Sequence, residues 1–230
     1  MQIEYQGHSC FIFKDGENSI IIDPFISGNP TSSISVDSVC VSGVLVTHGH
    51  ADHVGDAIDI AVQNDCPLYS TYELCNLLAL QEPKLKTEPM HIGGKVQTPW
   101  GWVKMVHALH GSTVELPNSQ LGHCGLAAGF VVQIGKFTIY HAGDTGLFGD
   151  MKLISAQYDL DVATLPIGDR FTMGPDDALL AAKWLKAKLY IPMHFNTFPI
   201  IEQDPEKWVL DLTASGLEGI SLKPGEFFVM

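Results

Sequence analysis

Three histidines and one aspartate lie within six consecutive positions of the stretch VLVTHGHADHVGD, which runs from Val44 to Asp56. Imidazole nitrogens and carboxylate oxygens are common protein ligands of zinc, iron and manganese. The stretch contains no cysteine, which disfavours a purely structural zinc site built from thiolates. The spacing therefore indicates a metal site of the catalytic type. Its candidate ligands are His48, His50, Asp52 and His53.

The position of these residues along the chain bears on how many ions they serve. The apolar run Val44–Val46 predicts a strand that ends just before them. Side chains alternate along an extended chain, so His48 and His50 point to the same side. Asp52 and His53 lie where the chain turns into a predicted helix, and they approach from another direction. Two ions, each bound by one pair, are a simpler interpretation than one tetrahedral ion.

Two ions need more ligands, and further candidates follow three other predicted strands. Strand ends are where layered α/β proteins gather a site. Asp144 lies between Gly143 and Gly146, which permit close backbone approach, so its two oxygens could bridge two ions. Alternation alone does not decide between His107 and His110. The set is His107 or His110 after Val103–Ala108, Asp144 after Phe137–Tyr140, and His194 after Leu189–Pro192.

Short apolar runs separated by turns predict the strands that must position these residues. The sequence KDGEN at 14–18 predicts a hairpin, because Asp-Gly accepts the positive φ of a tight turn. The sequence IGK at 134–136 predicts a second reversal. The predicted strands are Cys10–Phe13, Ser19–Ile22, Val44–Val46, Leu68–Ser70, Val103–Ala108, Gly129–Ile134, Phe137–Tyr140, Val162–Leu165 and Leu189–Pro192.

Helical patterns alternate with these strands through a single domain, residues 1–230. Pro175, with Asp176 and Asp177 beside it, favours a helix N-terminus. Because hairpins and helices are mixed, a purely parallel sheet is disfavoured. We expect a mixed α/β (α+β) fold, in which two mixed β-sheets form a sandwich with helices outside. The predicted helices are Asp52–Asn64, Thr71–Leu80, Pro175–Lys186 and Pro205–Ala214.

Composition argues against several classes of protein. The chain has 230 residues, of which 46% are hydrophobic, and no apolar run approaches the ~20 residues of a membrane helix. The start, MQIEYQGHSCF, lacks the pattern of a secretory signal. Five cysteines without a CxxC pair fit a reducing cytosol, so we expect a cytoplasmic protein. A net charge of −13 argues against a nucleic-acid partner.

The motifs resemble those of a known family. THGHADH resembles the HxHxDH signature of the metallo-β-lactamase superfamily, and the later histidine, the GDT aspartate and the final histidine follow in that family's order. GHSCF, IDPFISGN, ALHGS, IYHAGDTGLF and PIGDRFTMGP are similar to its small stand-alone metal-dependent hydrolases related to L-ascorbate-6-phosphate lactonase. The resemblance covers the whole chain and implies an αββα sandwich with metal ions at one edge of both sheets.

The resemblance also implies an assignment of ligands to two divalent metal ions, zinc in the first place, with manganese or iron as alternatives. It favours His110 over His107. The first ion would take His48, His50 and His110, the second would take Asp52, His53 and His194, and Asp144 would bridge them.

A site with two divalent metal ions can activate a bound water molecule. Two divalent ions, less the charges of Asp52, Asp144 and one bridging hydroxide, leave about +1, which lowers the pKa of bound water. We therefore expect a binuclear metal-dependent hydrolase whose metal-bridging hydroxide attacks a carbonyl or phosphoryl centre. The expected substrate is a small anionic lactone, ester or phosphodiester. A protein nucleophile is not needed, and Cys124 is expected to be a buried thiol.

Four residues near the ligands could support them. His8 and Asp23 adjoin early strands and could orient ligands or contact the substrate, although hydrogen bonding within a hairpin is an alternative. Asp169 and Arg170 follow Val162–Leu165. Arg170 could pair with Asp169 or with an anionic substrate. We expect the catalytic residues to be Asp52, His8 and Asp169.

Other functions on the same fold are weighed against this one. Nucleic-acid-processing hydrolases of the ribonuclease type carry an inserted domain or extra arms, for which this chain has no room. The di-iron redox family has a glutamate where His50 stands and a flavin domain, so we expect no flavin. A non-enzymatic metal-binding protein is a further alternative. The expected partner is a small-molecule substrate, without nucleic acid or membrane, and a homo-oligomer is left open.

Overall fold

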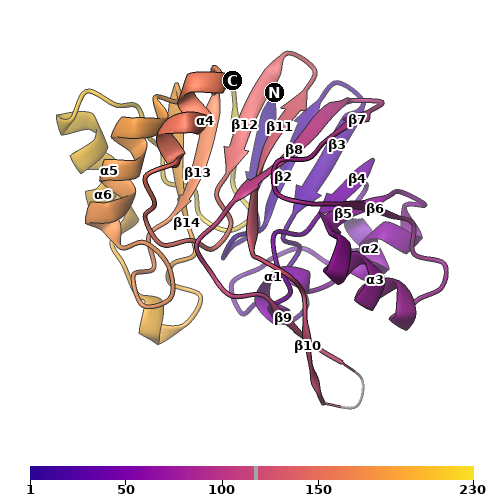
Figure 1. Ribbon diagram of the computed structural model, residues 1–230. Helices are drawn as coiled ribbons and strands as arrows, with labels where there is room; N and C mark the ends of the chain where they lie inside the picture. The colour runs from indigo at the N-terminus through magenta and orange to yellow at the C-terminus, as the bar shows by residue number, and fades with distance from the viewer. Residues whose placement is uncertain (117–118) are drawn as a thin grey trace.

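The computed structural model describes residues 1–116 and 119–230, which form two large β-sheets with helices on both sides. Figure 1 shows the sheets side by side, with α2 and α3 against one outer face and α4, α5 and α6 against the other. The two layers of strands and two layers of helices are the sandwich that the sequence predicts. Within the described residues, no helix is long and apolar enough to cross a membrane.

The first sheet has the strand order β15-β1-β2-β3-β4-β5-β6. Strands β1, β2 and β3 pair antiparallel, and β3 to β6 pair parallel. The strands are β1 Gln2–Tyr5, β2 Phe11–Asp15, β3 Asn18–Ile22, β4 Gly43–Leu45, β5 Leu68–Thr71, β6 Thr87–Met90 and β15 Phe227–Val229.

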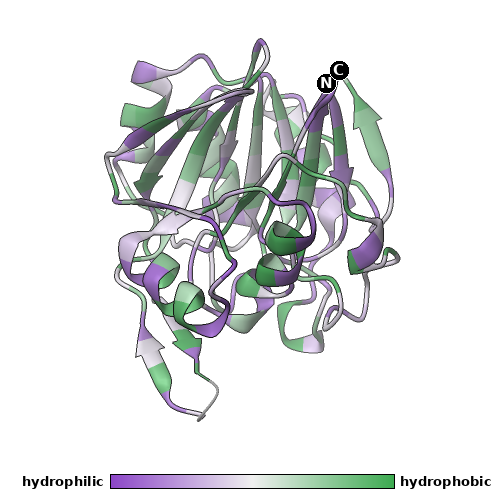
Figure 2. Cartoon of the chain, turned by 90° about the vertical axis from the view of Figure 1, so that its right-hand side faces the viewer, coloured by the Kyte–Doolittle hydropathy of each residue, from purple (hydrophilic) through white to green (hydrophobic). Residues whose placement is uncertain are grey.

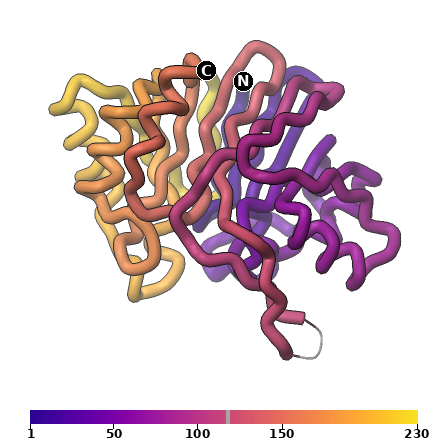
Figure 3. The backbone as a smooth tube through the Cα atoms, viewed as in Figure 1, coloured from indigo at the N-terminus to yellow at the C-terminus, as the bar shows by residue number. Residues whose placement is uncertain are grey.

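The second sheet has the order β14-β13-β12-β11-β8-β7. Its antiparallel part is β7, β8, β11 and β12, and β12 to β14 are parallel. The strands are β7 Lys95–Thr98, β8 Gly101–His107, β11 Ala128–Ile134, β12 Phe137–His141, β13 Val162–Pro166 and β14 Leu189–Met193. A separate hairpin of β9 Thr113–Glu115 and β10 Leu121–His123 projects from one end of the molecule (Figures 1 and 3).

Alternation along the strands separates two cores. Phe11 and Phe13 of β2 belong to a buried cluster that includes Phe130 of the second sheet. Ile12, between them, belongs instead to a cluster with Ile60 of α2 Ala57–Gln63 and residues of α3 Tyr72–Gln81. Figure 2 shows the apolar strands at the centre of the molecule. Burial of both faces of the first sheet explains its near-continuous apolar runs.

The second sheet is covered on its outer face by three helices, α4 Met151–Gln157, α5 Pro175–Leu185 and α6 Pro205–Ala214. Pro175 stands in the first turn of α5, as predicted, and Asp204 caps α6 by accepting a hydrogen bond from the backbone nitrogen of Lys207. Trp208 Nε1 donates to the carbonyl of Pro175 at 3.1 Å and ties α6 to the start of α5. Two short 3-10 helices, Val36–Ser38 and Pro199–Ile201, complete the described elements.

The strands and helices predicted from the sequence are all present, with ends shifted by up to two residues, except for one helix. The single helix predicted over Asp52–Asn64 is wrong. The chain forms a short α1, Ala51–Val54, and a separate α2, because Gly55 adopts a φ of +41° that interrupts the helix. The sequence prediction missed α4 and six short strands, β1, β6, β7, β9, β10 and β15, whose runs are brief or partly polar.

Candidate metal centre

The loops that carry the candidate ligands meet because β3, β4, β12, β13 and β14 end at the same edge of the two sheets. Three residues there have a positive φ, namely His8 at 54°, Asp23 at 48° and His194 at 56°. This conformation is uncommon outside glycine and is found where function constrains the backbone. His194 N donates to the carbonyl oxygen of His8 at 2.7 Å, so loops from both sheets hold each other.

One group of donor atoms comes from His48, His50 and His110. One ligand atom from each lies within 4.8 Å of the others. His48 Nε2 and His50 Nδ1 are 2.9 Å apart, and the ring centroids of His48 and His110 are 5.1 Å apart. This is the trio that the sequence analysis assigns to the first ion.

A second group comprises His8, Asp52, His53 and His194, whose ligand atoms also lie within 4.8 Å of one another. Three of these are the residues that the sequence analysis assigns to the second ion. His8 is an addition, because the sequence suggested a catalytic, supporting or substrate-contacting role for it and not that of a metal donor. Its Nε2 is 3.1 Å from Asp52 Oδ2.

Asp144 lies between the two groups. Its Oδ2 is 3.0 Å from His194 Nε2 and 3.6 Å from His110 Nε2, and its Oδ1 is 3.2 Å from His53 Nε2. The carboxylate therefore reaches members of both groups with its two oxygens. This is the position that a bridging ligand requires.

The donor set fits metal ions. His53 Nε2 and Asp144 Oδ1 are buried and lack a hydrogen-bond partner among the described residues, although they face each other. Burial opposes a charge on His53, but Asp144 and Asp23 on either side raise its pKa well above the ordinary value. A positive charge is thus favoured at this point. A divalent cation between nitrogen and carboxylate would satisfy both atoms.

The ionisation of Asp144 also favours a cation at this place. Burial alone would raise its pKa, but His194 and His53 lower it well below the ordinary value. The carboxylate is therefore ionised. By contrast, burial lowers the pKa of His48, His50 and His110. Neutral imidazoles have the free lone pair that a metal ligand must offer.

Asp23 orients two of the histidines from behind. It accepts a hydrogen bond from Thr47 N at 2.8 Å and another from Thr47 Oγ1 at 2.7 Å. The Thr47 hydroxyl has given its only proton to Asp23, so it accepts from His48 Nδ1 at 3.0 Å. His53 Nδ1 lies 2.8 Å from Asp23 Oδ2. Both rings are thereby held with Nε2 toward the donor groups.

A third histidine approaches the same carboxylate. His141 Nε2 is 3.4 Å from Asp23 Oδ2, and its Nδ1 is 2.8 Å from the hydroxyl of Thr164 on β13. His141 thus supports Asp23 rather than joining either donor group. Burial would raise the pKa of Asp23, but His53 and then His141 lower it below the ordinary range. The ionised carboxylate of Asp23 thus contacts residues of both sheets, His53 after β4 and His141 on β12.

His8 is held by a residue that the sequence analysis did not single out. Its Nδ1 is 2.9 Å from Thr197 Oγ1, and its ring centroid is 4.1 Å from that of His194. Burial lowers the pKa of His8 to about 4, partly offset by the hydrogen bond to Asp52. His8 is therefore neutral at pH 7. The hydroxyls that hold these histidines belong to three threonines, each in or after an apolar strand-like run: Thr47, Thr164 and Thr197. The sequence did not predict their role, because a single threonine in such a run has no distinguishing pattern.

The donors open to a pocket at the surface. Five of the six residues that line it belong to the two donor groups or to Asp144, and the sixth is Phe171, whose side chain is 54% exposed. Phe171 was also missed, because nothing marks one aromatic residue in a loop. The lining residues are His50, Asp52, His110, Asp144, Phe171 and His194.

The expected catalytic residue Asp169 does not reach this pocket. It is exposed, and its carboxylate lies over Gly174, where an added Cβ would be 2.9 Å from Oδ1. A positive φ of 67° turns the chain at Asp169, so the next residues rather than its own side chain approach the donors. The suggested ion pair with Arg170 is also absent among the described residues.

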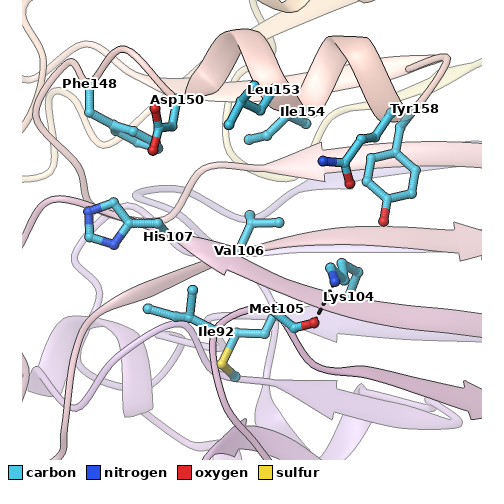
Figure 4. Close-up of a pocket in the computed structure, with 12 residues that line it drawn as sticks. Ile92, Lys104, Met105, Val106, His107, Phe148, Asp150, Leu153, Ile154 and Tyr158 are labelled. Carbon is cyan, nitrogen blue, oxygen red and sulfur yellow. Dashed lines mark hydrogen bonds between the residues drawn. The ribbon is translucent and has the colours of Figure 1, made fainter.

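The choice between His107 and His110, which strand alternation left open, is settled by placement. His107 lines a different hollow, between β8 and α4, where its ring packs edge-on against Phe148 with centroids 5.1 Å apart (Figure 4). Figure 4 shows His107 and Phe148 together at one end of that hollow. His110, three residues later, joins His48 and His50.

Cys124 is buried, as expected, and burial raises the pKa of its thiol to about 11. A neutral thiol is a poor nucleophile. The side chain lies near Gly49, where an added Cβ would be 2.7 Å from Sγ. Its role is therefore to pack against the loop that carries His48 and His50.

Comparison with known sequences agrees with this geometry. A family model described as a beta-lactamase superfamily domain matches residues 2–194. A protein of Bacillus cytotoxicus named UPF0173 metal-dependent hydrolase is 48% identical over 214 residues, 93% of each chain. A protein of the same name from Anoxybacillus flavithermus is 46% identical over 228 residues, 98% of each chain.

Comparison with solved structures also finds hydrolases with the fold of this chain. The chain resembles Igni18, described as a metallo hydrolase of the archaeon Ignicoccus hospitalis, with 31% identity and a TM-score of 0.86 over 100% of this chain and 98% of that one. An isothiocyanate hydrolase from gut bacteria of Delia radicum has the same fold, with 20% identity and a TM-score of 0.78 over 100% and 99% of the two chains.

Proposed function

The chain belongs to the beta-lactamase superfamily and is a metal-dependent hydrolase, and we propose that it works with two divalent metal ions. The observation that carries this proposal is the presence of two donor groups with Asp144 between them. One ion would be held by His48, His50 and His110. The other would be held by Asp52, His53 and His194, with His8 close enough to be a further ligand.

The donor types bear on which metal is bound. Imidazole and carboxylate ligands without thiolate accept zinc, manganese or iron. Six or seven such donors around a shared carboxylate suit zinc, which we propose in the first place. When bound, the ions supply an activated water as nucleophile and stabilise the charge that develops on the carbonyl or phosphoryl oxygen.

The residues of the chain prepare the site for that chemistry. Asp23 and Thr47 fix the rings of His53 and His48 so that no reorientation is needed when an ion binds. Thr197 holds His8 against Asp52. The ionised Asp144 supplies the negative charge that draws the two ions together.

The proposed substrate is a small molecule with a lactone, ester or phosphodiester bond. A nucleic-acid substrate is disfavoured by the net charge of −13, because phosphate backbones are bound by clustered basic side chains. We also propose a cytoplasmic location, because all five cysteines are unpaired thiols, as in proteins of reducing compartments.

The proposal is tested by counting metal ions and measuring hydrolysis on the same preparation. Elemental analysis of the purified protein should find two equivalents of divalent metal per chain. A panel of lactones, esters, thioesters and phosphodiesters should contain a substrate whose hydrolysis stops on chelation and returns when the metal is restored. One equivalent at saturation, or hydrolysis that survives complete chelation, would contradict a two-ion mechanism.

A further inference from the structure

The wall of the metal pocket that is not made of donors indicates what kind of substrate fits. That wall is Phe171, at the tip of the loop between β13 and α5. The loop is closed by a hydrogen bond from Asp169 N to Met173 O at 3.0 Å. Met173 N donates in turn to Thr145 O at 2.8 Å, beside Asp144. The loop that carries Phe171 is therefore anchored by backbone hydrogen bonds close to Asp144.

A second aromatic side chain flanks the same site. Phe198, 38% exposed, has its ring centroid 5.9 Å from that of His8. It lines a neighbouring hollow together with Thr197 and Glu202. Half-exposed aromatic rings at a pocket gain free energy when a ligand covers them. The apolar surface around the donors thus favours an alkyl or aryl group.

The side chains that line the site offer no positively charged partner to an anionic group. Among the described residues that line the metal pocket or the neighbouring hollow there is no lysine or arginine, and the latter has the carboxylate of Glu202. Sites for carboxylates and phosphates ordinarily use arginine forks or lysines. The net charge of −13 also slows the approach of anions.

Arg170 is a basic residue of the same loop that could favour an anionic substrate instead. It precedes Phe171 in the same loop, is exposed, and has no ion pair among the described residues. It does not line the pocket, whereas Phe171 does. Two adjacent residues therefore favour different substrate classes, and the lining favours the apolar one.

We propose that the enzyme hydrolyses uncharged esters or lactones and that Phe171 determines this specificity by packing against an alkyl or aryl group of the substrate. The inference rests on the proposed hydrolytic function and replaces the anionic substrate that the sequence suggested. The acyl C–O bond breaks, water supplies the oxygen of the new acid, and the alcohol leaves with a proton.

The first test compares two esters that differ only in charge. The neutral ester is 4-carbamoylphenyl butyrate and the anionic one is 4-carboxyphenyl butyrate. We expect the wild-type metal-loaded enzyme to prefer the neutral ester in kcat/KM by at least about tenfold. Phe171→Ala should lower kcat/KM for the neutral ester by about tenfold, mainly through KM, because ring burial is lost. Phe171→Leu should restore most of it.

Two control variants separate the alternatives. Phe227→Ala removes a similarly exposed phenylalanine on β15 and should change neither rate. Arg170→Ala should leave the preference between the esters unchanged. A preference for the anionic ester that Arg170→Ala abolishes would overturn the inference, and so would a Phe171→Ala variant with unchanged kinetics.

The second test reads binding without catalysis, by fluorine NMR of 4-fluorobenzamide and 4-fluorobenzoate with the purified protein. We expect the amide to bind at least about tenfold more tightly than the benzoate, and Phe171→Ala to weaken it about tenfold. Equal or tighter binding of the benzoate, no effect of Phe171→Ala, or no binding of the amide would overturn the inference. If neither ester is hydrolysed but the amide binds through Phe171, the ester-hydrolase function fails while the pocket preference holds.

Discussion

At the scale of single residues, Asp23 and Asp144 organise the site in different ways. Asp144 contacts histidines of both donor groups, whereas Asp23 contacts the far side of the rings and no ion position. A carboxylate behind a ligating histidine fixes the tautomer and the ring orientation. The two aspartates should therefore have separable effects on metal binding.

Replacing ligands should remove metal. Asp144→Ala should reduce the metal content most, because in the proposed two-ion site both ions would lose a ligand, and His50→Ala should weaken only the first proposed ion. Each loss should exceed the ~10–100-fold that follows removal of a partner behind a ligand. Elemental analysis after dialysis measures it, with His91→Ala as the control because His91 is exposed and outside the donor groups. Full metal content in either variant would refute the two-ion assignment.

Removing the charge of Asp23 should weaken metal binding without removing a ligand. Asp23→Asn keeps the size of the side chain but loses an acceptor for His53 and Thr47. We expect an affinity for zinc about 10–100-fold lower, measured by competition with a chromophoric chelator. Asp37→Asn, at an exposed carboxylate, should leave the affinity unchanged. An affinity equal to that of the wild type would show that Asp23 does not position the rings.

At the scale of elements, most donor residues are positioned by the ends of strands. The donors come from loops after β4, β8, β12 and β14, and His8 comes from the turn after β1. The break between α1 and α2 also positions donor residues. Asp52 and His53 lie in α1, whereas α2 packs against the first sheet. Gly55 makes that break, because only glycine readily adopts its φ.

Adding a side chain at Gly55 should destabilise the fold. An added Cβ at Gly55 would clash with the carbonyl oxygen of Pro24, and the φ of +41° is strained for alanine. We expect Gly55→Ala to lower the free energy of unfolding by about 2–3 kcal/mol. Urea denaturation of the metal-free protein measures this. Gly149→Ala is the matched control, because nothing lies within 4 Å of its added Cβ. Equal stability of the two variants would contradict this role of Gly55.

At the scale of the whole molecule, the metal centre joins the two sheets. Candidate ligands come from both, and His194 N also donates a hydrogen bond to His8 O across the junction. Ions that bind only the folded chain stabilise it by mass action. The centre should therefore contribute to global stability as well as to catalysis.

Chelation should lower the melting temperature. At a thousandfold excess of free ion over the dissociation constant, each ion contributes about 4 kcal/mol to the free energy of unfolding. For two ions and a domain of this size we expect Tm to fall by roughly 20 °C. Scanning calorimetry before and after chelation measures the shift, and restoring zinc should reverse it. An unchanged Tm would indicate that the ions do not bridge the sheets.

The sequence by itself determined the fold class, most strands and six of the donors that the structure brings together, namely His48, His50, Asp52, His53, Asp144 and His194. Periodicity reports burial locally, and dense His and Asp patterns at strand ends are rare enough to carry information. The tertiary structure alone decided between His107 and His110, brought His8 among the donors, turned Asp169 away and put Phe171 in its place. The physical reason is that these outcomes depend on loop backbone angles and on contacts between distant segments, which no local pattern encodes.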